Sequence, residues 1–280
     1  AEPPPHPASG AEHGGLAMVG MKDPPIEAHE DIRWLLWQQA REVVQSGEPR
    51  VVLLIGEEGA GKSRTAQSVV QTIAASGHME TIKLRYHQPA GPDDGYRGAV
   101  QEILAPWNDN RARLQARLTR WLSRDQQRSP SSVNVEASVL ARWCGYMDEG
   151  ETPVNAAVGL AFLYRHLDAR AWRGGALLLL EQAHLAQEAG DGLSICDAVI
   201  DRSIGERPFL VIATLSAEAI AEDPALAARV RSMERRGAMR VELSRMSDGE
   251  MRTLLRQTLN LDPSIAESIA PMCDGSPGRA

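Results

Sequence analysis

The chain has 280 residues, 43% of them apolar, which is enough for one large domain or for a domain with a small appendage. Its formal charge of -7 excludes an overall electrostatic attraction to nucleic acid, although a local basic face is compatible with it. The longest aliphatic runs, VVLLI and ALLLL, are far shorter than the roughly 20 residues that cross a bilayer, so we expect no membrane span.

Residues 1–16 begin AEPPPHPASG and are rich in proline and glycine, which is typical of a linker. They lack the basic and apolar regions of a secretory signal, and with the ending GSPGRA they suggest a segment cut from a longer polypeptide. Three widely spaced cysteines, Cys144, Cys196 and Cys273, indicate neither a disulfide framework nor a zinc site. We therefore expect buried thiols and a cytoplasmic location.

Five short apolar runs predict the strands of a sheet. Three of them, VVLLI, ALLLL and FLVIAT, are almost continuously apolar, which is typical of strands covered by helices on both faces. The sequence therefore predicts an α/β fold with a parallel sheet. The predicted strands are residues 51–55, 81–86, 176–180, 209–214 and 240–243.

Helical periodicity fills the intervals between these strands. The interval 87–175 is interpreted as a helical insertion, with SRDQQRSPSSVN (123–134) as its best loop candidate. After the last strand, Ser247 and Glu250 have the spacing of a capping box at the start of a helix. Helices are predicted within residues 26–47, 62–77, 95–104, 110–124, 153–171, 191–204 and 247–259, and further helical sequence follows at DPSIAESIAPMC.

The stretch GEEGAGKS follows the first strand and runs directly into a helix, and it matches the phosphate-loop pattern G-x-x-x-x-G-K-[ST]. Consecutive backbone N–H groups of such a loop converge on a polyphosphate, while Lys62 supplies positive charge and Ser63 a hydroxyl for Mg²⁺. The alternative is a glycine-rich turn without a ligand. The predicted nucleotide-binding residues are Gly56, Glu57, Glu58, Gly59, Ala60, Gly61, Lys62, Ser63 and Arg64.

The stretch LLLLEQAHLA carries the candidate catalytic residues, Glu181 and Gln182. If its strand lies near the phosphate loop, Glu181 reaches the shell of a Mg²⁺ ion that Ser63 also binds; the alternative is a solvated strand end. Gln182 stands where a second carboxylate would activate water, and an amide can orient water but cannot accept its proton at neutral pH. This pattern predicts slow or absent hydrolysis. His184 is interpreted as a hydrogen-bonded strand-end residue rather than a metal ligand.

The loop GEEGAGKS, the strand ALLLLEQAH and the tail DGSPGRA together resemble the STAND branch of AAA+-related P-loop ATPases. More narrowly, the chain is similar to the origin-recognition-type AAA module of bacterial multidomain regulators, from about Met18 to Ala280. The resemblance implies a five-stranded parallel core in the order 5-1-4-3-2, a helical lid, and an ATP/ADP switch that controls assembly. We accordingly expect a P-loop domain at 17–246 and an incomplete lid at 247–280.

The resemblance also implies nucleotide contacts outside the loop. Two departures from the family pattern, Gln182 and Ser216, concern hydrolysis or phosphate sensing rather than binding. The implied contacts are Val19 and Gly20 with adenine, Thr214 and Ser216 at the end of the sensor strand, and Gly275 and Pro277 near the base or ribose.

Two groups of arginines have alternative interpretations. One group forms a basic stripe on a helix, which suits a nucleic acid, an acidic partner or plain solvent exposure. The other precedes the last strand, where an arginine of AAA-type rings reaches a neighbour's γ-phosphate, or where arginines simply cover the surface. The stripe holds Arg113, Arg117, Arg120 and Arg124, and the second group holds Arg229, Arg231, Arg235 and Arg236.

Three functions fit these features. The first is an ATP-binding regulatory switch that works with its own copies, a protein partner or an effector domain of a parent chain. The second is a competent ATPase in which Gln182 positions water and a neighbour's arginine supplies charge. The third is a DNA-associated ATPase, although no helix-turn-helix or winged-helix pattern supports it. A kinase catalytic domain is disfavoured because neither HRD nor DFG occurs in the chain.

Overall fold

The computed structural model describes most of the chain, and the termini and several loops lie outside the described part. None of the helices it describes combines the length and apolarity that a membrane span requires. The described residues are 29–91, 94–104, 110–123, 129–146, 150, 165, 174–186, 192–203, 207–259 and 261–276.

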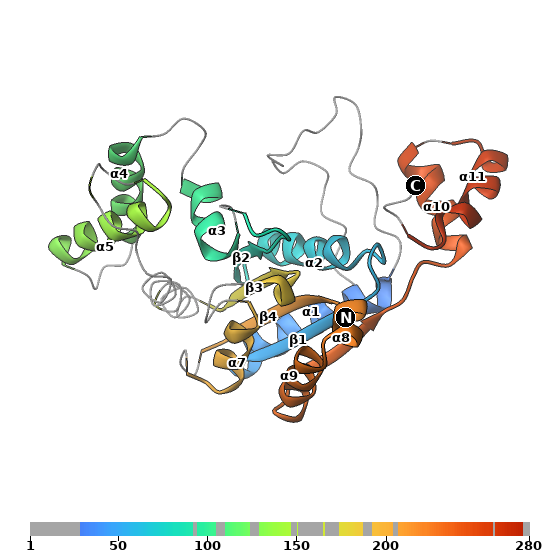
Figure 1. Ribbon diagram of the computed structural model, residues 1–280, viewed down its shortest axis with the longest axis horizontal. Coiled ribbons are helices and arrows are strands. Elements are labelled where there is room, and N and C mark those ends of the chain that lie inside the picture. Colours follow the sequence, from blue (N-terminus) through green and yellow to red (C-terminus); the bar gives the residue numbers. More distant parts are fainter. Residues whose placement is uncertain are drawn as a thin grey trace.

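One parallel sheet of five strands forms the centre of the molecule (Figure 1). Its order is β2-β3-β4-β1-β5, which confirms the order expected from the family resemblance. All four pairings are parallel, and β1 lies between β4 and β5. The strands are β1 (Arg50–Gly56), β2 (Glu80–Arg85), β3 (Ala176–Glu181), β4 (Phe209–Ser216) and β5 (Met239–Leu243).

Helices connect the strands and surround the sheet (Figure 1). The predicted loop at 123–134 is partly wrong, because α5 begins at Pro130. Ser129 caps this helix, since its hydroxyl accepts a hydrogen bond from the Ser132 amide. The helix predicted within 153–171 lies outside the described residues, apart from Arg165. The helices are α1 (Glu30–Ser46), α2 (Lys62–Ser76), α3 (Gly95–Leu104), α4 (Arg111–Leu122), α5 (Pro130–Trp143), α7 (Leu193–Ile200), α8 (Ala217–Glu222), α9 (Pro224–Arg235), α10 (Asp248–Leu259) and α11 (Pro263–Ile269), with 3₁₀ turns η1 (Ala183–Leu185) and η2 (Ala270–Cys273).

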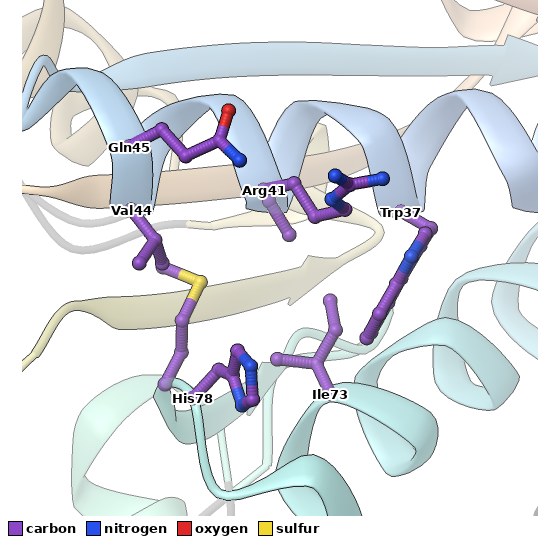
Figure 2. A pocket seen from close by; sticks show the side chains of 8 residues that line it. Trp37, Arg41, Val44, Gln45, Ile73 and His78 are labelled. Carbon is purple, nitrogen blue, oxygen red and sulfur yellow. The ribbon is translucent and has the colours of Figure 1, made fainter. Parts of the chain in front are cut away.

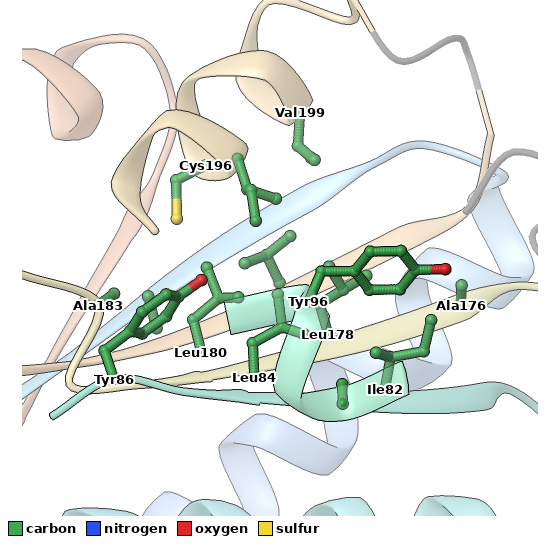
Figure 3. Close-up of a cluster of buried hydrophobic side chains, with 14 of the residues drawn as sticks. Ile82, Leu84, Tyr86, Tyr96, Ala176, Leu178, Leu180, Ala183, Cys196 and Val199 are labelled. Atoms are coloured by element: carbon green, nitrogen blue, oxygen red, sulfur yellow. The ribbon is translucent and has the colours of Figure 1, made fainter. Parts of the chain in front are cut away.

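Each face of the sheet packs into its own hydrophobic cluster, since successive strand residues point to opposite faces. Leu54 of β1 packs with α1 and α2, whereas Leu53 packs with the helices of the other face. Figure 3 shows the second cluster, where Leu84 and Leu180 lie beneath Cys196 of α7. Burying each such leucine contributes about 2 kcal/mol. These continuous apolar strands therefore hold the carboxyl edge of the sheet in place.

The three cysteines are free and buried, as expected from their spacing. Burial raises the pKa of Cys144 and of Cys196 to about 12, so both are protonated thiols at neutral pH. They act as small apolar side chains in the core.

The helices α10, α11 and η2 form a small unit with a hydrophobic cluster of its own. Its first helix begins with the predicted capping box: the Ser247 hydroxyl accepts from the Glu250 amide at 3.3 Å, and the Glu250 carboxylate accepts from the Ser247 amide at 2.7 Å. In Figure 1 this unit lies beyond the end of β5. We call α10, α11 and η2 the lid; the boundary predicted at residue 247 stays a prediction.

Candidate nucleotide-binding site

The phosphate loop connects the buried end of β1 to the first turn of α2. Gly59 and Gly61 have φ angles of 78° and 95°, which glycine adopts without the strain of a side chain. Ala60 between them is fully buried and anchors the loop in the core. The sequence therefore folds locally into a curled loop whose backbone amides lead into a helix N-terminus, a geometry that suits an anion.

Lys62 lies over this loop. Its ammonium donates to the carbonyl oxygens of Gly56 at 2.7 Å and Glu57 at 2.6 Å. Burial lowers the pKa of Lys62, while the carboxylates of Glu218, Glu58 and Glu57 oppose that shift. Two of its three hydrogens are thus used by the loop, and the third can reach a distal phosphate.

Ser63 and Arg64 lie in the first turn of α2, and both are half-buried. Ser63 and Gln67 share one face of the helix because they are four residues apart. Ser63 is the second residue of α2, directly after the loop, where the sequence predicts that its hydroxyl binds Mg²⁺.

Glu181 ends β3 and is 7% exposed, so its carboxylate is buried rather than solvated. One oxygen accepts a hydrogen bond from the Gln67 amide at 2.5 Å. The other lies 3.4 Å from Lys83 Nζ and 3.4 Å from Arg85 Nε on the neighbouring strand. Since Gln67 is one helical turn from Ser63, Glu181 lies close to the predicted magnesium position, but two cations already neutralise it.

Gln182 has an exposed side chain and a left-handed backbone, with φ 56° and ψ 46°. Its backbone N–H donates to the hydroxyl of Thr214 at 2.9 Å. Thr214 is 1% exposed, so it fixes the turn after β3 from within the sheet. The predicted contact of Thr214 with nucleotide stays a prediction; its described role is to position Gln182.

His184 lies in η1, and the sequence analysis assigned it only a structural role. Burial and the nearby charge of Lys62 lower its pKa, so the imidazole is neutral at pH 7. The predicted hydrogen bond is absent at one ring nitrogen, since buried Nδ1 has no partner within the described residues. The effect of Lys62 on His184 indicates that the two are neighbours, which the sequence spacing could not reveal.

Ser216 ends β4 opposite Gly56 of β1, so it lies at the start of the loop. Its hydroxyl accepts from the Ala219 amide at 3.2 Å, which caps α8, and donates to the Glu218 carboxylate at 2.6 Å. The other carboxylate oxygen of Glu218 accepts from the loop amide of Glu58 at 3.0 Å. The predicted sensor position thus brings a carboxylate to the loop that no motif pointed to.

The turn after η2, residues 274–276, contacts the phosphate loop directly. Gly275 has a φ of 65°, and the next residue, Ser276, is 6% exposed and donates to the Gly59 carbonyl at 3.4 Å. A Cβ on Gly59 would lie 2.1 Å from the Ser276 hydroxyl oxygen. Glycine at position 59 is therefore required by the lid as well as by the loop.

Arg245 joins the loop to the lid from the segment after β5. It forms an ion pair with Glu57 at 2.5 Å, a second ion pair with the Asp274 carboxylate, and a hydrogen bond to the Asp274 carbonyl at 3.1 Å. We call Glu57, Arg245 and Asp274 the loop–lid triad. The predicted adenine contacts Val19 and Gly20, and the predicted base or ribose contact Pro277, lie outside the described residues.

Of the four arginines before β5, two form ion pairs with α7 and two do not. Arg229 pairs with Asp197 of α7 at 2.8 Å, and Arg236 pairs with Asp201 at 2.7 Å, so both hold α9 against α7. Arg231 and Arg235 are exposed, and in the described part of the chain no ion pair is assigned to either. These two are the remaining candidates for contact with a neighbouring molecule.

The arginine-rich helix α4 is amphipathic, as its pattern predicts. Leu114, Leu118 and Leu122 are buried. On its other side Arg113 and Arg120 are exposed, while Arg117 is half-buried and Arg124 lies outside the described residues. The structure therefore agrees with an amphipathic surface helix.

A pocket of about 280 Å³ lies between α1 and the end of α2 (Figure 2). Trp37, Arg41 and His78 are among its lining residues. It is at the opposite end of α2 from Lys62, a distance of about 20 Å along a helix of this length. The pocket is therefore separate from the phosphate loop.

Two solved structures share this architecture over most of the chain. The Aeropyrum pernix ORC2 protein (ADPNP-ADP complexes) has a TM-score of 0.54 and 14% identity, covering 90% of this chain and 60% of that one. The fold is that of the AAA+ P-loop NTPases. Drosophila ORC bound to DNA has a TM-score of 0.53 and 11% identity, covering 93% of this chain and 55% of that one.

The chain spans less than two thirds of either structure's chain. No protein-family model and no curated protein matches its sequence. At such low identity the likeness establishes the fold, and a site on that fold has to be argued from its own residues.

Proposed function

We propose that the chain is an ATP-binding regulatory module of the AAA+/STAND type, in which the bound nucleotide sets the position of the lid and hydrolysis is slow or absent. The observation that carries the proposal is the direct connection between lid and phosphate loop. Ser276 packs on Gly59, and the loop–lid triad ties Glu57 to Asp274 through Arg245. A ligand that rearranges the loop must therefore act on the lid as well.

The residues present fit a nucleotide with Mg²⁺. The curled loop supplies amides, Lys62 supplies charge for the distal phosphates, and Ser63 supplies a hydroxyl. In the described part of the chain no group of three or more His, Cys, Asp or Glu side chains gathers around a metal position. Mg²⁺ bound with phosphates needs fewer protein ligands, and Ser63 and Glu181 would supply them.

The proposal of slow hydrolysis rests on the end of β3. Gln182 can orient water but cannot accept a proton, and Glu181 is already paired with Lys83 and Arg85. A competent ATPase is the second candidate, favoured by one observation: the neutral imidazole of His184 lies near Lys62 and is able to accept a proton. Arg231 or Arg235 of a second copy would then add charge to the site.

The ORC2 structure named above contains ADPNP and ADP, which supports adenine nucleotides as the ligands to test. The first experiment measures the binding of ATP and ADP with Mg²⁺ by calorimetry, for wild type and Lys62→Ala. Steady-state phosphate release over a range of protein concentrations separates the two candidates, because an arginine contributed by a second copy makes turnover rise with concentration.

The second experiment follows the lid. Cysteines introduced at Val135 and Met272, which are 65% and 78% exposed, accept a donor and an acceptor dye while the native thiols stay buried. We expect ATP and ADP to give different transfer efficiencies in wild type. In Arg245→Gln both nucleotides should bind, but with a smaller difference between the two efficiencies.

Arg240→Gln is the matched control, because Arg240 also pairs with two carboxylates, Glu234 and Glu242, but does not join the lid to the loop. Its transfer efficiencies should equal those of wild type. Nucleotide binding without any change in transfer efficiency would rule out the switch and leave a simple nucleotide-binding domain.

A further inference from the structure

Glu218 is a carboxylate held at the phosphate loop by two hydrogen bonds. It lies in α8, which begins directly after β4, and β4 pairs with β1 so that Ser216 is level with Gly56. One of its oxygens accepts from the Glu58 amide at 3.0 Å and the other from the Ser216 hydroxyl at 2.6 Å. The side chain is therefore fixed over the loop, although it is exposed to solvent.

The charge of Glu218 acts on the loop lysine. Among the carboxylates that raise the pKa of Lys62, Glu218 has the largest effect, ahead of the loop's own Glu58 and Glu57. The hydrogen bonds from Ser216 and from the Glu58 amide hold the pKa of Glu218 at about 2, so it is ionised at neutral pH. A permanent negative charge thus stands beside the cation of the loop.

The donors that Glu218 uses are those a phosphate would use. In phosphate loops the backbone amides and the lysine are the groups that bind the phosphates, and the lysine reaches the distal ones. Glu218 accepts from a loop amide and lies near Lys62. A carboxylate and a terminal phosphate in this place compete for the same donors and repel each other.

We propose that Glu218 determines nucleotide specificity by competing with the terminal phosphate of ATP, so that the wild-type site favours ADP over ATP. This inference rests on the proposed nucleotide binding and adds to it the group that distinguishes the two ligands. ADP lacks the phosphate that meets Glu218, whereas ATP binds after the carboxylate has left the Glu58 amide.

The test compares the affinities of ADPNP and ADP with Mg²⁺ in wild type, Glu218→Gln and Glu218→Ala. Glutamine keeps an acceptor for the Glu58 amide and removes the charge, whereas alanine removes both. In both variants we expect ADPNP to bind about tenfold more tightly, with ADP changing by less than about twofold. Higher salt should reduce the gain, because the exposed carboxylate is screened by ions.

Glu222→Gln is the matched control, since it removes the same charge from the same helix, and Glu222 is exposed. It should change the ratio of the two affinities by less than about twofold. A change in Glu218→Ala without one in Glu218→Gln would mean that Glu218 merely holds the loop, which overturns the inference. Equal changes for both nucleotides would overturn it as well.

The two proposals fail in different ways. Nucleotide binding that is lost in Lys62→Ala, together with an unchanged ratio in Glu218→Gln, would refute the role of Glu218 alone. Absence of nucleotide binding in wild type would refute the proposed function, and the role of Glu218 with it.

Discussion

The phosphate loop and the end of β3 are the two parts of the candidate site, and they are built differently. The loop consists of backbone groups shaped by Gly59 and Gly61, and its lysine is held by two carbonyls of the same loop. The end of β3 consists of side chains. There Glu181 is engaged by Gln67 and two basic neighbours, and the side chain of Gln182 is exposed.

This difference separates binding from chemistry. Backbone amides bind phosphate whatever the neighbouring side chains are, so the loop keeps its capacity as long as its glycines and Lys62 remain. Proton transfer depends on one side chain with a suitable pKa at one position. A chain can therefore keep nucleotide affinity and lose hydrolysis through a single change at the end of β3.

The largest expected effect is at the loop. Lys62→Ala should weaken ATP binding by about 3–4 kcal/mol, a few hundredfold, because a charged donor to the distal phosphates is lost. Calorimetry with Mg²⁺ present measures it. Arg41→Ala removes a cation at the other end of α2 and should leave the affinity within about twofold. Equal losses in both variants would mean that general charge, rather than the loop, attracts the nucleotide.

The next effect is at the end of β3. Gln182→Glu introduces a group that can accept a proton, so phosphate release should rise about 100-fold, the lower end of what a general base contributes. The affinity for ADP should stay within about threefold of wild type, since the loop is untouched. Single-turnover phosphate release measures the rate. A fall in release would show instead that the amide is a working part of an active ATPase.

A smaller effect concerns how Gln182 is held. Thr214→Val keeps the shape of a buried side chain but removes the acceptor for the backbone N–H of Gln182, which should lower the free energy of unfolding by about 1–2 kcal/mol. Urea unfolding measures it. Thr72→Val, on the half-buried face of α2, makes the same chemical change and should cost less than about 0.5 kcal/mol. Similar costs at both positions would mean that Thr214 does not position the turn.

Most of the fold could be predicted from the sequence because its signals are local. Short apolar runs marked all five strands, and the predicted ranges differ from the observed ones by at most two residues at either end. No separate helix was predicted for α5, whose first turn, SPSS, looks like a loop although Pro130 is well suited to the start of a helix. The short α8 was missed because six residues show no period.

The site could be predicted only in part, because only its local signals are visible in the sequence. The loop is a contiguous motif, so its residues were visible in the sequence. Glu218 reaches Glu58 across 160 positions, and Arg245 reaches Glu57 across 188. Contacts of this kind depend on the order of strands in the sheet, and no spacing along the chain encodes them.

The smallest expected effect is the contribution of the Glu218 charge to the free energy of unfolding, which depends on pH. The pKa of Glu218 is lowered from 4.5 to about 2, so its ionised form stabilises the folded state above pH 4.5 and loses this effect as the pH falls through about 2. Because the side chain is exposed, screening limits the contribution to less than about 1 kcal/mol.

Glu218→Gln should therefore be slightly less stable than wild type at pH 7 and equal to it near pH 2, as measured by urea unfolding at a series of pH values. Between pH 5 and 8 the charge of Glu218 does not change, whereas the terminal phosphates of the nucleotides take up their second charge at about pH 6. A preference that titrates equally in wild type and Glu218→Gln would arise from a group other than Glu218, such as the nucleotide phosphate itself. The difference between the two proteins thus isolates the contribution of Glu218 from that of the other titrating groups.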